Sequence, residues 1–378
     1  MIAPSAPDRR WYGLAFVEFD DMGDYWEQEQ LTRALATIED ARRRSNGRTI
    51  AILFIHGWKN NASERSGNVY DFRVQLNRIA QSLCLKPDDC GVVGLYIAWR
   101  GDVVGRMFPE LRQFTFFDRR NAAMRVASPS LTATLHATMR KARESKQAVV
   151  VAIGHSFGAI VLERALTQSL QSLEQLEPPA NLIALVNEAG PAIDAKQFMV
   201  ALKQRNLELR WSDSRPRPLF LSVSSTGDSA TRAILPIGQS VTALKRTFRQ
   251  YQPGDPLNPP GITDQKKYFT TATAHLPILQ SHAVGPCADP EIKGAYKAGR
   301  DLQPIPVRIP RKGAKPQPVE YCVVAKPEAW NTTPYWAMQI PVEIVPDHST
   351  IFTGRFVDFL MGFLPGEQMY QPAELRSR

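Results

Sequence analysis

Three short runs of apolar and β-branched residues constrain the fold of this chain most strongly. They cover residues 49–55, 91–98 and 148–153. Strands of a parallel sheet that are buried on both faces have near-continuous apolar sequences of this kind. Segments with apolar residues at helical spacing lie before, between and after them, at residues 28–44, 68–83 with Asn68 as the cap, 128–145 and 157–173. This alternation predicts an α/β fold, with a mostly parallel central sheet covered by helices on both faces.

Further elements are expected before and after this alternation. Apolar segments predict strands at residues 11–19, 182–186, 219–223 and 339–345, and a last helix at residues 350–363. Residues 232–336 contain proline-rich segments and break the alternation, so we expect a lid-like insertion before the last strand. A length of 378 residues permits one or two domains. We interpret residues 1–378 as a single domain that carries this insertion.

The charge balance favours anionic partners without identifying one. The chain has 46 Lys and Arg against 37 Asp and Glu, a formal net charge of +9. A positive field attracts anionic surfaces, acidic substrates or nucleic acid, whereas the simpler interpretation is a solvated basic surface. The one run of three basic residues, Arg42 to Arg44, ends a predicted helix, where cations suit the negative end of the helix dipole. We therefore expect no nucleic-acid binding and leave contact with an anionic surface open.

Cysteines and apolar segments limit the classes of protein further. Cys84, Cys90, Cys287 and Cys322 form no CxxC pair that would indicate zinc. Cys84 and Cys90 can bridge a short loop in an oxidising compartment, and free thiols fit the sequence equally well. The first ten residues lack the apolar core of a secretory signal, and the longest apolar runs are far below the roughly 20 residues that span a bilayer. We expect no transmembrane span, and a cytoplasmic location unless a signal has been removed.

The segment from Gly154 to Gly158 contains a candidate nucleophile, Ser156. A Gly-x-Ser-x-Gly match alone is weak, but this one lies between a predicted buried strand and a predicted helix, the setting of a nucleophile elbow. Such a turn strains the serine backbone and brings strand and helix close together, so the residues two positions on either side must be small. The alternative is a glycine-flanked turn in which Ser156 only caps the helix.

A nucleophilic serine needs a base and an acid that orients the base. Among the six histidines, His348 follows the last predicted strand, where open α/β sheets gather their ligand-binding groups. Asp228 follows the strand predicted at residues 219–223, and Asp194, after the preceding strand, is its rival. Asp347 adjoins His348 in sequence, and adjacent side chains seldom converge. We predict Ser156, Asp228 and His348 as the catalytic residues.

Two backbone N–H groups are candidates for binding the oxyanion of an acyl-transfer intermediate. Phe157 supplies one at the start of the helix that follows Ser156, where the helix dipole adds to its effect. Trp58 supplies the other, in the segment His56-Gly57-Trp58 that follows the strand predicted at residues 49–55. The alternative for His56-Gly57-Trp58 is a tight strand exit with a packed indole.

These segments together resemble the α/β-hydrolase superfamily. The resemblance rests on residues 54–58, 154–159, 227–228 and 347–348, and residues 56–62, 99–101 and 227–232 are similar to a less characterised bacterial and fungal branch. The resemblance implies cleavage of esters, thioesters or amides without a cofactor or metal. Ser156 argues against members whose nucleophile is Asp or Cys.

The predicted function is hydrolysis of a carboxylic ester, as in an esterase or lipase, with a small-molecule or lipid ester as substrate. Two alternatives remain: an acyltransferase of the same fold, and a non-catalytic hydrolase-like scaffold that binds a ligand or a protein. A phenylalanine-rich loop at residues 99–127 can line an acyl pocket, although simple aromatic packing explains it equally well.

Overall fold

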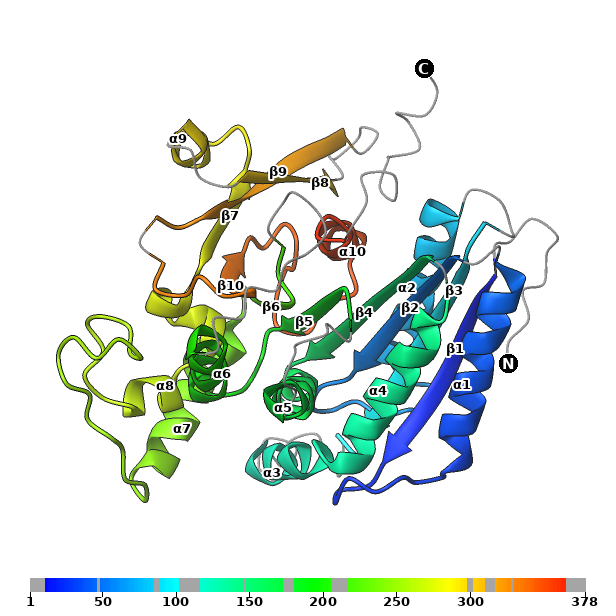
Figure 1. Ribbon diagram of the computed structural model, residues 1–378, viewed down its shortest axis with the longest axis horizontal. Helices are drawn as coiled ribbons and strands as arrows, with labels where there is room; N and C mark the ends of the chain where they lie inside the picture. The colour runs from blue at the N-terminus through cyan, green and yellow to red at the C-terminus, as the bar shows by residue number, and fades with distance from the viewer. Residues whose placement is uncertain are drawn as a thin grey trace. The chain divides into compact units, whose positions relative to one another are not determined.

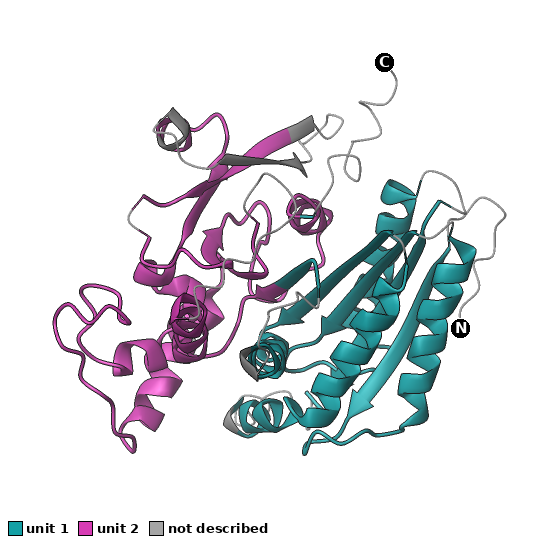
Figure 2. Ribbon diagram, in the orientation of Figure 1, with its two compact units in different colours: residues 1–183, 364–378 teal, residues 184–363 magenta. Residues whose placement is uncertain are grey.

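The structure is a computed structural model that describes residues 11–45, 48–84, 89–101, 116–145, 147–172, 180–204, 217–297, 302–309, 317–327 and 329–364. The chain divides into two compact units (Figure 2). Unit 1 comprises residues 1–183 and 364–378, and unit 2 comprises residues 184–363. The boundary falls within strand β5 (Leu182–Val186).

A seven-stranded sheet has the order β1-β3-β2-β4-β5-β6-β10. The strands pair in parallel in β1 with β3, β3 with β2, β2 with β4, and β6 with β10. The predicted α/β fold with a mostly parallel central sheet is therefore confirmed. The strands other than β5 are β1 (Tyr12–Phe19), β2 (Arg48–Ile55), β3 (Gly91–Trp99), β4 (Gln147–His155), β6 (Phe220–Ser225) and β10 (Tyr335–Ile340).

Helices cover both faces of the sheet in unit 1 (Figure 1). A side chain at Gly91 of β3 would meet Ala41 of α1, whereas one at Gly94 would meet Phe72 and Leu76 of α2. Positions three apart in a strand point to opposite faces, so α1 and α2 lie on opposite sides of β3. The helices of this unit are α1 (Glu29–Arg44), α2 (Gly67–Leu83), α3 (Phe116–Val126), α4 (Pro129–Arg143) and α5 (Phe157–Ser172).

Burial explains the sequence patterns of the strands. Every residue of β3 is buried, as is all of β2 after its first residue, which accounts for their continuous apolar runs. The edge strand β1 instead alternates half-buried and buried positions, as expected for a strand with one face covered.

Unit 2 contains β6, β10 and a second, three-stranded sheet in the order β7-β9-β8, whose pairs are antiparallel. This second sheet lies within residues 232–336, between β6 and β10, where an insertion is predicted. The other elements of this unit are α6 (Ala192–Gln204), η2 (Ala230–Ile234), α7 (Leu235–Ala243), α8 (Lys266–Thr270), η3 (Thr273–His275), η4 (Pro277–Leu279), β7 (His282–Pro286), α9 (Pro290–Lys297), β8 (Leu302–Ile309), β9 (Gln317–Ala325) and α10 (Gly354–Met361).

Several predicted element bounds are wrong. The last helix, expected at residues 350–363, is α10 and covers Gly354–Met361, and the last strand begins at Tyr335 rather than at residue 339. The last strand, expected at residues 339–345, is β10 and ends at Ile340, because Pro341 has no N–H for the ladder and instead accepts a turn hydrogen bond from Ile344. The cap of α2 is Ser66 rather than Asn68. Asn68 accepts a hydrogen bond from the Tyr96 hydroxyl group at 2.8 Å, so its side chain ties α2 to β3.

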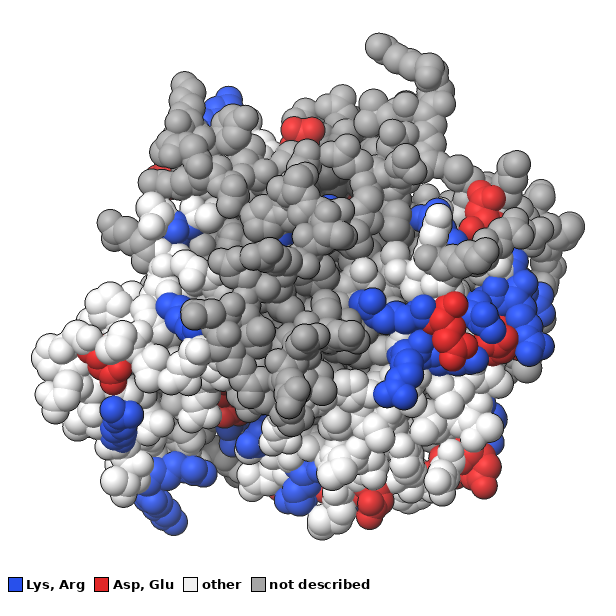
Figure 3. All heavy atoms as spheres, viewed as in Figure 1, with Lys and Arg blue, Asp and Glu red and all other residues white. Residues whose placement is uncertain are grey.

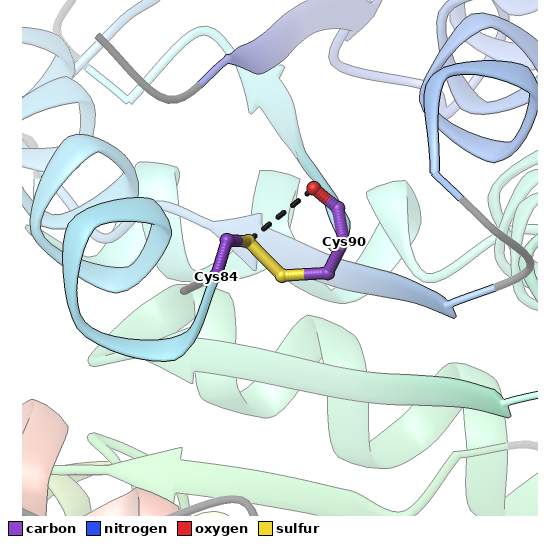
Figure 4. The surroundings of a disulfide bond; sticks show 2 residues. All are labelled: Cys84 and Cys90. Atoms are coloured by element: carbon purple, nitrogen blue, oxygen red, sulfur yellow. Dashed lines mark hydrogen bonds between the residues drawn. A yellow bond between two sulfur atoms is a disulfide. The ribbon is translucent and has the colours of Figure 1, made fainter. Parts of the chain in front are cut away.

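All four cysteines are paired. Cys84, at the end of α2, bonds to Cys90, just before β3 (Figure 4). Cys287, between β7 and α9, bonds to Cys322 of β9. The sequence left open whether Cys84 and Cys90 are free thiols or form a disulfide, and in the structure they form a disulfide.

The basic residues at the end of α1 are partly neutralised by acids. Glu39 forms ion pairs with Arg42, Arg43 and Lys141, and Lys141 also pairs with Glu144. Lys and Arg accordingly lie beside Asp and Glu on the right of Figure 3. The charges at this end of α1 are therefore mixed rather than uniformly positive.

Candidate active site in two parts

Ser156 is the single residue between a strand and a helix. β4 ends at His155 and α5 begins at Phe157. The backbone φ of Ser156 is 55°, in the left-handed region that costs an L-residue about 1–2 kcal/mol. Only 4% of Ser156 is exposed. A strained polar residue at such a turn is typical of functional sites.

Three glycines permit the close approach that this turn requires. A Cβ at Gly154 would lie 2.6 Å from the backbone of Ala159, and one at Gly158 would lie 2.2 Å from the carbonyl oxygen of Ile55. A Cβ at Gly57 would lie 2.8 Å from Ser156 Cβ. The loop after β2 therefore packs directly against the Ser156 turn, as the predicted oxyanion loop must.

His56 is a structural residue of this loop. Its Nε2 accepts a hydrogen bond from the Trp99 N–H at 3.1 Å, so Nδ1 carries the proton and donates to the Gly57 carbonyl at 2.8 Å. The Trp99 indole N–H donates in turn to the His56 carbonyl at 3.0 Å. Burial lowers the pKa of His56 to about 4, so its ring is neutral at pH 7. The segments 56–62 and 99–101 thus hold one another at adjacent strand ends.

Trp58 belongs to an aromatic cluster beside the Ser156 turn. Its ring centroid lies 5.5 Å from that of Phe116 and 6.2 Å from that of Phe157, and the two phenylalanine rings are 5.1 Å apart. Part of the segment predicted as a phenylalanine-rich loop is helix α3, and its first residue, Phe116, packs against Phe157 next to the predicted nucleophile. Phe108 and Phe114 lie outside the described residues, as does the side chain of Phe117.

In unit 2, Asp228 and His348 are hydrogen bonded. His348 Nδ1 lies 3.0 Å from Asp228 Oδ2. A carboxylate only accepts, so Nδ1 carries the proton and the lone pair of the ring is on Nε2. Asp228 is fully buried and follows β6, whereas His348 follows β10 and keeps 23% of its side chain exposed. The tautomer is the one that a general base oriented by an acid requires.

The surroundings of Asp228 favour its charged form. Burial raises the pKa of Asp228, but the hydrogen bond and charge of His348 and two hydrogen bonds from Thr231 lower it, and the lowering prevails. The Thr231 N–H donates to Oδ1 at 3.0 Å, and its hydroxyl group donates to Oδ2 at 2.5 Å. Asp228 is therefore an anion at neutral pH, held at both oxygens.

Asn187, which sequence reasoning missed, attaches the His348 loop to the sheet. Its side-chain N–H groups donate to the carbonyl oxygens of Asp347 and His348, both at 3.0 Å, and its Oδ1 accepts from the Ser225 N–H at 2.8 Å. Asn187 is fully buried, has a φ of 47°, and directly follows β5. The available signal was a polar residue that can adopt the left-handed conformation at the end of an apolar strand.

The other acids considered have different places. Asp194 lies in the first turn of α6. Asp347 accepts hydrogen bonds from the N–H groups of Ser349 and Thr350 in its own turn. The acid that binds His348 is therefore Asp228.

Of the remaining histidines, His136 binds the Ser169 hydroxyl group, and His282 stacks on Trp336 with ring centroids 3.6 Å apart. The predicted site residues thus form two groups. Ser156, the glycines and the two oxyanion candidates belong to unit 1, and Asp228 and His348 belong to unit 2.

Within the described residues, no group of three or more His, Cys, Asp or Glu side chains is arranged to hold a metal ion. In the same part of the chain, helices are too short or too polar to cross a bilayer. Comparisons with protein families, with curated proteins and with solved structures find no match to this chain.

Proposed function

We propose that this chain is a serine hydrolase of the α/β-hydrolase fold that cleaves carboxylic esters, with Ser156 as nucleophile, His348 as general base and acid, and Asp228 as the acid that orients His348. The observation that carries the proposal is the His348–Asp228 hydrogen bond at 3.0 Å, because it leaves the His348 lone pair on Nε2. The strained Ser156 backbone supports the same conclusion independently.

The sheet order also supports the proposal. Ser156 follows β4, Asp228 follows β6 and His348 follows β10, and these are strands of one sheet. Open parallel sheets bind their ligands at the carboxyl ends of the strands. Catalysis requires that the Ser156 hydroxyl group come within hydrogen-bond reach of His348 Nε2.

The reaction proceeds in two halves. Ser156 Oγ attacks the ester carbonyl carbon while His348 Nε2 takes the hydroxyl proton, and the N–H groups of Trp58 and Phe157 bind the oxyanion. His348 then gives this proton to the departing alcohol, which leaves an acyl group on Ser156. Water attacks the acyl group with His348 again taking a proton, and return of this proton to Ser156 Oγ releases the carboxylic acid.

The aromatic cluster of Trp58, Phe116 and Phe157 favours an apolar acyl group. These rings pack beside the Ser156 turn, where Phe157 is buried and Trp58 and Phe116 remain partly exposed as hydrocarbon surface. We expect kcat/KM to rise with acyl chain length over a p-nitrophenyl ester series and to fall after Phe116→Ala. An unchanged chain-length profile in this variant would argue that the cluster only packs the loop.

Covalent labelling with a fluorophosphonate probe tests the proposal. Wild type should label, Ser156→Ala should not, and Ser156→Ala should lose p-nitrophenyl ester turnover by roughly 10⁴-fold or more. Ser145→Ala is the matched control, since Ser145 is another buried serine of unit 1 that bonds Thr49. A wild type that does not label refutes the function, and product analysis with added alcohols separates hydrolysis from acyl transfer.

A further inference from the structure

A second histidine, His275, is joined to the proposed catalytic acid through a hydroxyl group. Thr231 Oγ1 lies 2.5 Å from Asp228 Oδ2 and 2.8 Å from His275 Nε2. His275 ends the short helix η3, and its Nδ1 lies 3.1 Å from Gln339 Nε2 of β10. These four side chains form one continuous chain of hydrogen bonds within unit 2, ending at the carboxylate oxygen that His348 also contacts.

The direction of each hydrogen bond in this chain is determined. The Asp228 carboxylate can only accept, so the single Thr231 hydroxyl proton points to it. Thr231 Oγ1 must then accept from His275, which places a proton on His275 Nε2. Gln339 donates its amide N–H to His275 Nδ1, which is therefore unprotonated. His275 is thus a neutral ring in its Nε2–H tautomer.

The charges around His275 do not make it an ion. Burial lowers the pKa of His275, the charge of Asp228 raises it, and Arg232 and His348 lower it again, so that the lowering prevails. The Nε2 proton of His275 is directed at Thr231, and its Nδ1 accepts from Gln339. His275 therefore has no free nitrogen with which to take the proton of a nucleophile, and His348 remains the candidate base. What His275 can do is to hold the Thr231 hydroxyl group in one orientation.

We propose that His275 is a positioning residue, which acts through Thr231 to hold the Asp228 carboxylate in the orientation that His348 needs. This role rests on the proposed function. Without His275, the Thr231 oxygen loses its donor, and its hydrogen bond to Asp228 Oδ2 loses the cooperative strengthening that this donor gives. The Asp228 carboxylate is then held less firmly, and His348 loses orientation without losing its own hydrogen bond.

Non-additive kinetics test this role. His275→Leu and Thr231→Val should each lower kcat by about tenfold, the effect of losing one hydrogen bond, with KM changed by less than about twofold. The double variant should be no worse than Thr231→Val alone, because His275 acts only through that hydroxyl group. His275→Gln keeps an N–H donor and should recover most of kcat. His136→Leu is the matched control, since His136 also bonds a serine hydroxyl group but lies in α4 of unit 1.

The outcomes separate this role from the proposed function. A wild type that does not label with the fluorophosphonate probe refutes the function and the role of His275 together. A wild type that labels, combined with multiplicative losses in the double variant or no loss in His275→Leu, refutes the role of His275 alone. The imidazole ¹⁵N shifts of the whole protein give a check without activity: His275 should be the Nε2–H tautomer, and the Nδ1–H tautomer overturns the proposal.

Discussion

Replacing Gly158 with alanine is the sharpest test of how the Ser156 turn is built. The added Cβ would lie 2.2 Å from the Ile55 carbonyl oxygen and 2.6 Å from that of His56, whereas ordinary contact begins near 3.4 Å. The helix start or the end of β2 must therefore move by about 1 Å. β2 is bonded to β3 on one side and β4 on the other, so its backbone resists this shift.

We expect the free energy of unfolding of Gly158→Ala to fall by about 2–4 kcal/mol, in the upper range for overpacking, because both obstacles are backbone atoms. Movement of the loop after β2 also moves the Trp58 N–H away from Ser156. A misplacement of about 1 Å costs on the order of 10²-fold in rate, so fluorophosphonate labelling should slow by a similar factor.

Urea unfolding followed by far-UV circular dichroism measures the stability, and labelling at a fixed probe concentration measures the reactivity. Gly67→Ala is the control. Gly67 is the first residue of α2 in the same unit, and a Cβ there meets nothing within 4 Å. This variant should be unchanged or up to about 1 kcal/mol more stable. A Gly158→Ala protein as stable and as reactive as wild type would refute the close packing of this loop on the turn.

Three further predictions follow from local conformation, titration and covalent linkage. Ser156→Gly and Ser156→Ala should both fail to label. The glycine variant should be more stable than the alanine variant by about 1 kcal/mol, because glycine accepts the left-handed backbone. Equal stability of the two variants in urea unfolding would argue against strain at this residue. The pKa of His56 is lowered to about 4 in the folded protein, so as the pH falls His56 is protonated in the unfolded chain before it is protonated in the folded one. The stability that depends on His56 should be complete above pH 6.5, and the free energy of unfolding should fall by about 3 kcal/mol as the pH is lowered to 4. His56→Gln should lack this contribution, and parallel urea curves for both proteins at all pH values would contradict it. Reduction of the Cys287–Cys322 bond, which closes a separation of 35 residues, should lower the free energy of unfolding by about 4 kcal/mol; thiols that react with Ellman's reagent in the folded, unreduced protein would show that this bond is absent.

Much of the fold and one half of the candidate site were predictable from the sequence. The buried strands β2, β3 and β4 and the helices after them are encoded by patterns that span fewer than twenty residues. The strand, glycine-flanked Ser156 and helix are likewise contiguous in the chain. The end of β10 was misplaced, although Pro341 marks it locally, because the apolar residues up to Val345 resemble a continued strand.

The residues that hold Asp228 and His348 in place through hydrogen bonds could not be predicted from local sequence patterns. Asn187 holds a loop 161 residues away at His348, and Thr231 joins Asp228 to His275, 44 residues beyond Thr231. Hydrogen bonds between distant segments leave no periodic pattern, because each partner needs only one polar atom at the right place. The choice between Asp228 and Asp194, open in the sequence, is likewise a matter of which carboxylate meets His348.

The sequence by itself thus determined which segments form buried strands and helices, since hydrophobic periodicity and backbone preferences act over a few neighbouring residues. It also determined where a strained serine is tolerated, because only glycine neighbours allow the approach found at Ser156. Only the tertiary structure showed that the predicted His348 and Asp228 are hydrogen bonded, that His56 is neutral and structural, and which cysteines pair. These outcomes depend on distances between side chains that are far apart in the chain, and folding sets those distances.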